Sequence, residues 1–136
     1  MKVVFDAGVV FSGAGWRGEA YRCLLAMAQR RVTAYATETT LNELNDLLAD
    51  RGNAMKHPPS AIVHWFQDRV KRVEPAPLGK QRSRDAKDDP YLACALSAVA
   101  QFMITRDDDL LVLGKPFGIQ IMTPRELLVR LTKPLV

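Results

Sequence analysis

The chain has 136 residues, enough for one domain with a hydrophobic core and too few for two of ordinary size. Hydrophobic residues make up 48% and charged residues 25%, as in average soluble globular proteins, which excludes a disordered or fibrous chain. A formal net charge of +4 is compatible with a polyanionic partner but does not require one. The longest nearly apolar run, 92–104, is too short to cross a bilayer, and Asp6 interrupts the N-terminal apolar stretch where a signal peptide needs continuity. We therefore expect a cytoplasmic protein with residues 1–136 in a single domain and no membrane partner.

The first half of the chain alternates β-like and helical segments. A β-branched run predicts a strand over Lys2–Phe5, and apolar residues at helical spacing predict a helix over Arg17–Gln29. A second strand is predicted over Val32–Ala36 and a second helix over Leu41–Leu48. The Pro-Pro-Ser sequence that begins at Pro58 then opens an amphipathic helix.

The second half continues this alternation after a long exposed loop, which two prolines, a glycine and several charges predict over 73–87. A helix is expected over Asp89–Ala100, followed by strands over Phe102–Thr105 and Ile119–Met122. The Thr-Pro-Arg-Glu sequence that begins at Thr123 is a capping box and announces a last helix. Strands that alternate with helices favour an α/β fold, a three-layer α/β/α sandwich with a central parallel sheet.

The two cysteines lie far apart in the sequence. Cys23 and Cys94 each have apolar neighbours. This setting predicts buried, reduced thiols and argues against a disulfide or a metal site.

Four acidic residues are expected at one edge of this sheet. Asp6 directly follows the first strand, and Asp107 stands two residues after the third. Glu43 lies in the first turn of the helix after the second strand, and Asp89 begins the helix that leads to the third. The carboxyl ends of parallel strands meet at one edge, so these side chains are expected to converge.

Each of these acids also has a structural explanation. Asp6 is an ordinary turn former, and Glu43 completes a capping box with Thr40. Asp89 is a typical N-cap, and Asp107 can cap the short turn that follows it. Only the convergence of the four acids favours a catalytic role over these structural ones, because clustered carboxylates repel one another unless cations neutralise them.

Hard divalent ions such as Mg²⁺ and Mn²⁺ take oxygen ligands, and such a site can activate water against a phosphodiester. If the four acids converge, like-charge repulsion predicts that Asp89→Asn raises the melting temperature of the metal-free protein.

The two histidines of the chain have no partner at a recognisable catalytic spacing.

Four short motifs in this order resemble the PIN-domain nucleases. The motifs are Val-Val-Phe-Asp6, Thr-Leu-Asn-Glu43-Leu, Lys-Asp-Asp89-Pro-Tyr-Leu-Ala-Cys-Ala and Ile-Thr-Arg-Asp107-Asp-Asp-Leu-Leu. More narrowly, the chain is similar to the bacterial VapC-like toxins of toxin–antitoxin systems, whose usual final strand and helix match the ending Ile-Gln-Ile-Met-Thr-Pro-Arg-Glu-Leu-Leu. The likeness covers essentially the whole chain.

The resemblance implies a ribonuclease that uses Mg²⁺ or Mn²⁺, usually as a homodimer, with RNA as substrate and a cognate antitoxin protein as partner. Carried over to this sequence, the catalytic quartet is Asp6, Glu43, Asp89 and Asp107. The metal ligands among them are Asp6, Asp89 and Asp107.

Three neighbouring residues are expected to support this site. Asp88 or Asp109 could replace or supplement its neighbour, although the distance from Asp89 to Asp107 fits the family spacing better. Thr105 matches a position that supports the site by hydrogen bonding. Relatives commonly have Asn where this chain has Gly8, and the change predicts a looser first loop and weaker activity.

Basic residues near these motifs are candidates for contacts with the RNA backbone, which dominate affinity. The candidates are Arg17, Arg51, Lys80, Arg82, Arg84, Lys87 and Arg106. An alternative function is a weakly active or inactive PIN scaffold that binds RNA or a protein partner. A third alternative, a phosphoacceptor domain that uses Asp6, is weaker because no second carboxylate stands two residues on.

Overall fold

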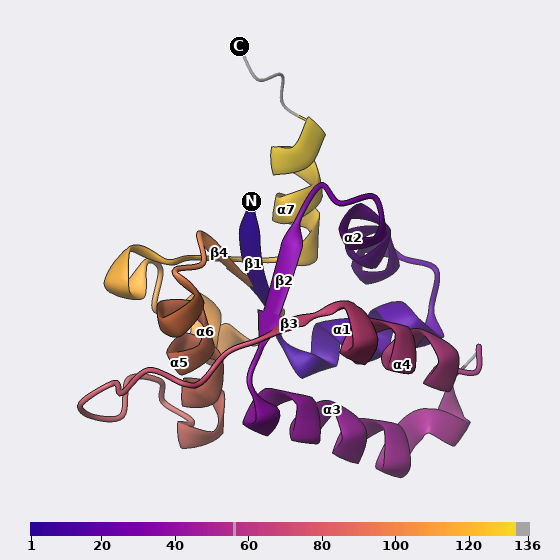
Figure 1. Cartoon of the computed structure of the whole chain (residues 1–136), viewed down its shortest axis with the longest axis horizontal. Helices are drawn as coiled ribbons and strands as arrows, with labels where there is room; N and C mark the ends of the chain where they lie inside the picture. The colour runs from indigo at the N-terminus through magenta and orange to yellow at the C-terminus, as the bar shows by residue number, and fades with distance from the viewer. Residues whose placement is uncertain (56, 133–136) are drawn as a thin grey trace.

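The computed structural model describes residues 1–55 and 57–132 and is built around a five-stranded sheet (Figure 1). Its strands are β1 (Lys2–Phe5), β2 (Thr33–Ala36), β3 (Lys71–Arg72), β4 (Phe102–Ile104) and β5 (Gln120–Met122). They lie in the order β3-β2-β1-β4-β5, and every neighbouring pair is parallel. The predicted parallel sheet is therefore confirmed.

Helices cover both faces of this sheet. They are α1 (Ala7–Gly15), α2 (Glu19–Ala28), α3 (Glu38–Arg51), α4 (Ser60–Arg69), α5 (Asp89–Ala98), α6 (Asp108–Leu111) and α7 (Pro124–Thr132). In Figure 1, α5 and α6 lie on one side of the strands and α1, α2 and α4 on the other. Consistently, α5 contacts β1, β2 and β4, whereas α1 contacts α2, α3 and α4, and α2 contacts α7. This is the three-layer α/β/α sandwich expected from the sequence.

The central strands are apolar because both of their faces are covered. The side chains of Val3, Val4 and Phe5 in β1 are buried, as are all three residues of β4. Parallel strands between two helical layers have no solvated face, and so they lack the alternation of a half-exposed strand. The core thus holds β1 and β4 side by side, and it fixes the position of the residues that come directly after each strand.

The helix α1 and the strand β3 were not predicted from the sequence. Asp6-Ala7-Gly8 was expected to form a turn, but α1 begins at Ala7, directly after β1. The Asp6 side chain caps it by accepting from the Gly8 backbone amide at 3.0 Å, and Val9, Val10 and Phe11 are buried. The other element is β3, whose two residues are too few to show a strand period.

The start of α3 also differs from the prediction. The helix begins at Glu38, and its N-cap is Thr37, which forms a capping box with Thr40. The expected box of Thr40 with Glu43 is therefore wrong, and Glu43 lies in the second turn rather than the first. Glu43 thus has no capping role that competes with a functional one.

Other predicted features are confirmed. Thr123 and Glu126 form the expected reciprocal cap of α7, with Thr123 Oγ1 accepting from the Glu126 amide at 3.2 Å. Cys23 and Cys94 are free and buried, and burial raises the pKa of each thiol to about 12. Within residues 1–55 and 57–132, no helix has the length and apolar character needed to cross a membrane.

Candidate active site

Asp6 and Asp107 are brought together by the pairing of β1 with β4. Asp6 directly follows β1, and Thr105 directly follows β4. The last residues of these two strands, Phe5 and Ile104, are register partners. The Thr105 hydroxyl donates to Asp6 Oδ2 at 2.7 Å and accepts from the Asp107 backbone amide at 3.0 Å. Because Thr105 is fully buried, its hydroxyl holds both acids in fixed positions. The structure thus places Thr105 where the sequence predicted a supporting residue.

The first loop is not loosened by Gly8. The Gly8 backbone amide donates to Asp6 Oδ1, so one carboxylate oxygen is held by α1 and the other by Thr105. Burial raises the pKa of Asp6, hydrogen bonds from Thr105 and Gly8 partly offset this, and the charge of Asp107 raises it further. The expected loose loop is wrong, because α1 begins where that loop was predicted.

Asp88 is the buried acid of this group. Its side chain is 8% exposed, and its Oδ2 atom has no hydrogen-bond partner among the described residues. Burial raises the pKa of Asp88 to about 7, together with a hydrogen bond to Asp107 and the negative charges of Asp107, Asp85 and Asp6. A buried carboxylate surrounded by like charges costs stability unless a cation balances it.

Asp89 is engaged elsewhere. Its Oδ1 accepts from the Ser83 backbone amide at 2.7 Å and its Oδ2 from the Arg82 amide at 3.0 Å. Consecutive residues at a helix start project about 100° apart, so Asp88 and Asp89 cannot both face the same group. A hydrogen bond with Asp107 and the charges of Asp107 and Asp6 act on Asp88, so Asp88, rather than the preferred Asp89, belongs to this group. The N-cap residue of α5 is also Asp88, so the N-cap interpretation of Asp89 is wrong.

Glu43 reaches the group from α3 and is oriented by Tyr91. The Tyr91 hydroxyl donates to Glu43 Oε2 at 2.5 Å and accepts from the Ala7 backbone amide at 3.2 Å. Burial raises the pKa of Glu43, and the charges of nearby acids including Asp6 add to this, although the Tyr91 hydrogen bond partly offsets it. The pKa of Tyr91 lies above its usual range because the hydroxyl is buried beside Asp6 and Glu43.

Sequence reasoning missed Tyr91 and Asp85. Tyr91 stands three residues after Asp88, a spacing that puts two side chains on one face of a helix. Asp85 lies at the N-cap of the 3₁₀ turn Ala86–Asp88, where its Oδ1 accepts from the Lys87 amide at 3.0 Å. Carboxylate oxygens of Asp85, Asp88 and Asp109 lie within 4.8 Å of one another. Asp109 was expected to support the site, and this cluster places it beside Asp88.

Comparison with known proteins identifies the fold around these acids. The model of the PIN domain family matches residues 2–109. The chain belongs to the PIN domain family. The crystal structure of PAE2754 from Pyrobaculum aerophilum is similar over 96% of this chain and 89% of that one, with a TM-score of 0.66 and 20% identity. No curated protein matches the chain significantly.

The residues of this PIN domain fit a divalent metal ion. PIN domains are typically metal-dependent nucleases, and the donor set here consists of carboxylate oxygens, the ligands that hard cations prefer. The buried, unpartnered Oδ2 of Asp88 supplies a donor that the described residues leave unsatisfied. Burial is the main cause of the raised pKa values of Asp6, Glu43 and Asp88, and the negative charges of neighbouring acids raise each of them further.

Several of the predicted RNA-contact residues make local contacts in this PIN domain. Arg84 pairs with Asp109 at 2.9 Å, and Arg106 Nη1 donates to Ser12 Oγ at 3.2 Å. The guanidinium groups of Arg82 and Arg17 stack on Phe117 and Tyr21, at 5.1 and 4.4 Å from the ring centroids. Lys80 and Lys87 have exposed side chains. The RNA contacts of these residues remain a prediction.

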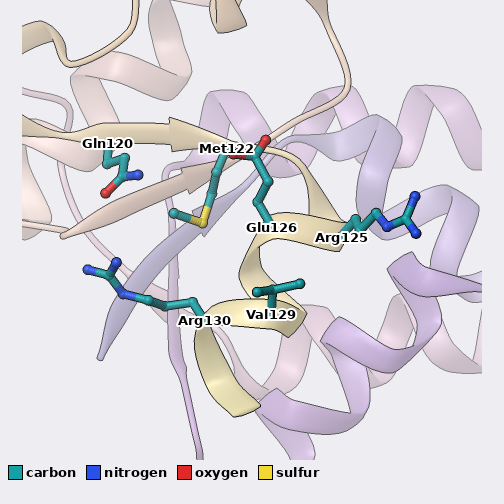
Figure 2. Close-up of a pocket in the computed structure, with 6 residues that line it drawn as sticks. All are labelled: Gln120, Met122, Arg125, Glu126, Val129 and Arg130. Atoms are coloured by element: carbon teal, nitrogen blue, oxygen red, sulfur yellow. The ribbon is translucent and has the colours of Figure 1, made fainter. Parts of the chain in front are cut away.

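A separate pocket of about 310 Å³ lies between β5 and α7 (Figure 2). Figure 2 shows Met122 from β5 directed between Arg130 and Val129 of α7. None of its lining residues belongs to the acidic group, and its one carboxylate, Glu126, is engaged in the cap of α7. We therefore take the acids, and not this pocket, as the candidate active site.

Proposed function

We propose that this PIN domain is a metal-dependent endoribonuclease that hydrolyses RNA phosphodiesters at the group formed by Asp6, Asp88 and Asp107. The observation that carries the proposal is the buried Asp88 carboxylate, whose Oδ2 has no partner among the described residues and whose neighbours are like-charged acids. A protein tolerates such an arrangement when a bound cation offsets its cost. The family supports a nuclease-type fold, and the resemblance of the sequence motifs to those of ribonucleases is the reason for proposing RNA as the substrate.

In this proposal Asp6, Asp88 and Asp107 hold Mg²⁺ or Mn²⁺. A bound ion of this kind lowers the pKa of water and offsets charge on the leaving oxygen. Thr105 positions two of the ligands, because its hydroxyl bonds both the Asp6 carboxylate and the Asp107 amide. Glu43, oriented by Tyr91 and with a raised pKa, is suited to accept a proton from the attacking water.

Cleavage assays with purified protein test the proposal. Structured RNA, unstructured RNA and DNA of the same sequence are incubated with Mg²⁺, with Mn²⁺ and with chelator. Asp6→Asn, Asp88→Asn and Asp107→Asn are compared with wild type, and Asp68→Asn on the exposed surface of α4 is the matched control. We expect metal-dependent RNA cleavage that survives in Asp68→Asn and is lost in the other three. Equal cleavage by all variants would indicate a contaminating nuclease and sink the assignment.

We also propose that the enzyme is the toxin of a toxin–antitoxin pair, acting as a homodimer, on the basis of its VapC-like motif order. Expression in a bacterial host then arrests growth, and Asp6→Asn relieves the arrest. A small neighbouring reading frame that encodes an antitoxin is expected, and its coexpression restores growth. Normal growth with a well-expressed wild type contradicts the toxin role while leaving the nuclease proposal intact.

The alternative is a PIN scaffold that binds RNA or a protein without turnover, and Gly8 is the observation that favours it. A Cβ at this position would lie 3.7 Å from Asp6 Oδ1, an ordinary contact, so a side chain fits there. If activity is low because the amide of the usual Asn is missing, Gly8→Asn raises it. RNA binding without cleavage in both wild type and Gly8→Asn favours the binding module.

A further inference from the structure

We propose that a basic pocket beside the start of β2 binds a nucleotide, either free or as one unit of an RNA chain. Its cations Arg30, Arg69 and Lys71 receive the phosphate, and the base stacks on Trp65. None of its lining residues belongs to the acidic group, which follows the carboxyl ends of β1 and β4, whereas the pocket lies where β2 begins. The inference therefore goes beyond the proposed function.

The short strand β3 leaves room for this pocket. β3 pairs only with Tyr35 and Ala36, so Thr33 and Ala34 have no strand on that side of β2. There the end of α4, the start of β3 and the turn after α2 border a hollow of about 390 Å³. The buried residues Val32 and Ala34 supply part of its apolar lining. Pockets that bind small molecules measure roughly 300–1,000 Å³, so the hollow is large enough for such a ligand.

The charged side chains of the pocket all have the same sign. Arg30, Arg69 and Lys71 line it and are exposed, and no acidic residue of the described chain lines it. Neither of the ion pairs formed within residues 1–55 and 57–132 includes one of these three cations. Cations gathered in a hollow attract a polyvalent anion, and guanidinium groups match phosphate oxygens in a bidentate geometry. The pocket thus favours a phosphate group.

Arg30 occupies a backbone position that favours glycine. It follows α2 in a Schellman motif, in which the amides of Arg30 and Arg31 donate to the carbonyl oxygens of Met27 and Ala26 at 3.0 and 2.9 Å. The φ angle of Arg30 is 61°, in the left-handed region where a residue with a Cβ is less stable than glycine. Folding alone gives no reason for a guanidinium here, whereas an anion in the pocket does.

Trp65 adds an aromatic face beside these cations. It is half-buried in α4, and the guanidinium carbon of Arg69 lies 6.0 Å from the centroid of its ring. An anion held by Arg69 is therefore close to the indole. Inorganic phosphate and a carboxylate side chain have no ring to place against it. A nucleotide uses both features, because its phosphate binds cations and its base stacks on aromatic side chains.

Quenching of Trp65 fluorescence tests the proposal without metal or cleavage. The chain has two tryptophans, so Trp16→Phe leaves Trp65 as the only one. This protein is titrated in low-salt buffer with chelator, using AMP, a 5′-phosphorylated RNA oligonucleotide, adenosine and a glutamate-rich peptide. We expect saturable quenching by AMP that weakens as salt is added, and at least about tenfold weaker binding of adenosine. Tighter binding of the RNA than of AMP identifies a unit of a chain as the ligand, and otherwise the ligand is the free nucleotide.

Substitutions in the Trp16→Phe background test the three cations. Arg69→Gln and Lys71→Gln are each expected to weaken AMP binding by about three- to tenfold. Arg22→Gln removes an exposed cation of α2 that does not line the pocket, and it should leave binding unchanged. Arg30→Gly should weaken binding as well, yet raise the melting temperature by about 2–6 °C, because glycine suits this backbone position. This combination separates a binding role of Arg30 from a structural one.

The stacking role of Trp65 is tested by calorimetry with AMP. Trp65→Phe keeps an aromatic ring and should retain most of the affinity, whereas Trp65→Leu should bind about tenfold more weakly. Equal affinities in these two variants would show that the base does not stack on residue 65, and would overturn that part of the proposal.

Other outcomes overturn the nucleotide pocket as a whole. These are the absence of saturable quenching by both AMP and RNA, adenosine binding as tight as that of AMP, and equal AMP affinities in the three cation variants and their parent. Preferential binding of the glutamate-rich peptide would make the pocket a site for an acidic protein segment instead. Because chelator is present throughout, these results do not depend on the cleavage assay, and the two proposals can fail separately.

Discussion

At the residue scale, two adjacent aspartates have opposite roles. Asp88 is buried among like charges with an oxygen that no described residue contacts by a hydrogen bond, whereas both oxygens of Asp89 accept backbone amides from the 82–83 segment. The same substitution should therefore have opposite effects at the two positions. The sequence predicts that Asp89→Asn stabilises the metal-free protein, whereas the structure predicts this effect for Asp88→Asn.

Asp88→Asn is expected to stabilise the metal-free protein by about 1 kcal/mol or more at pH 8, because it removes one charge from the acidic group. Asp89→Asn is expected to destabilise it by about 1–2 kcal/mol, because the new NH₂ group faces a backbone amide donor. Urea unfolding followed by circular dichroism, with chelator present, measures both. Destabilisation by Asp88→Asn would contradict the crowded-carboxylate interpretation.

Thr105→Val tests the residue that joins Asp6 to Asp107. Valine has a similar shape and preserves packing in the core, but it lacks the hydroxyl that both acids contact. We expect a loss of about 1–3 kcal/mol in unfolding free energy and weaker Mn²⁺ binding. Denaturant titration and calorimetry measure the two effects, and wild-type Mn²⁺ affinity in the variant would show that Thr105 does not position the ligands.

At the element scale, Tyr91 connects α5, α3 and the start of α1. One hydroxyl bonds Glu43 of α3 and the Ala7 amide of α1, and Tyr91 is 1% exposed. Tyr91→Phe leaves the Ala7 amide without this partner, which is expected to cost about 1–3 kcal/mol. Because the Tyr91 hydrogen bond lowers the pKa of Glu43, its loss should raise that pKa further.

The pH–rate profile of the proposed RNA cleavage separates this positioning role from general destabilisation. In Tyr91→Phe, the acid limb of the profile should move to higher pH, because Glu43 must be ionised to accept a proton. A variant that is merely less stable loses activity without moving that limb. Leu92→Val, a core substitution in the same helix, serves as the control for destabilisation.

At the scale of the whole molecule, the acidic group makes stability depend on pH and on metal. Asp88 has an ordinary pKa of 3.8 and a pKa of about 7 in the folded protein. A carboxyl with a raised folded-state pKa contributes stability that is present below pH 3.8 and is lost as pH rises through about 7. The metal-free protein should thus lose stability over this window relative to Asp88→Asn.

Divalent metal should reverse this loss, because the ion binds the ionised carboxylates of the folded protein and stabilises it by mass action. Mn²⁺ is expected to raise the melting temperature little at pH 5 and several degrees at pH 8. Thermal unfolding of wild type and Asp88→Asn across this range measures both effects. An equal rise at both pH values would show that ionisation of the group is not coupled to metal binding.

The sequence by itself determined the layers and the edge of the sheet where Asp6 and Asp107 lie. Apolar runs such as Lys2–Phe5 and Phe102–Thr105 alternate with helical segments, and this local pattern suffices for a parallel α/β sandwich. It also placed Asp6 directly after one strand and Asp107 a few residues after another, and the pairing of β1 with β4 brings the two acids together. These features follow from short-range periodicity and from the common direction of parallel strands.

Only the tertiary structure decided which side chains face one another. Asp88 and Asp89 are adjacent in sequence, and which of them is directed at the acids depends on how α5 packs on the sheet and on the 82–83 amides that bind the other. Tyr91 and Asp85 likewise gain their roles from contacts with α3 and α6, far away along the chain. Rotation of a helix about its axis and the path of a loop depend on long-range packing, which local periodicity does not encode.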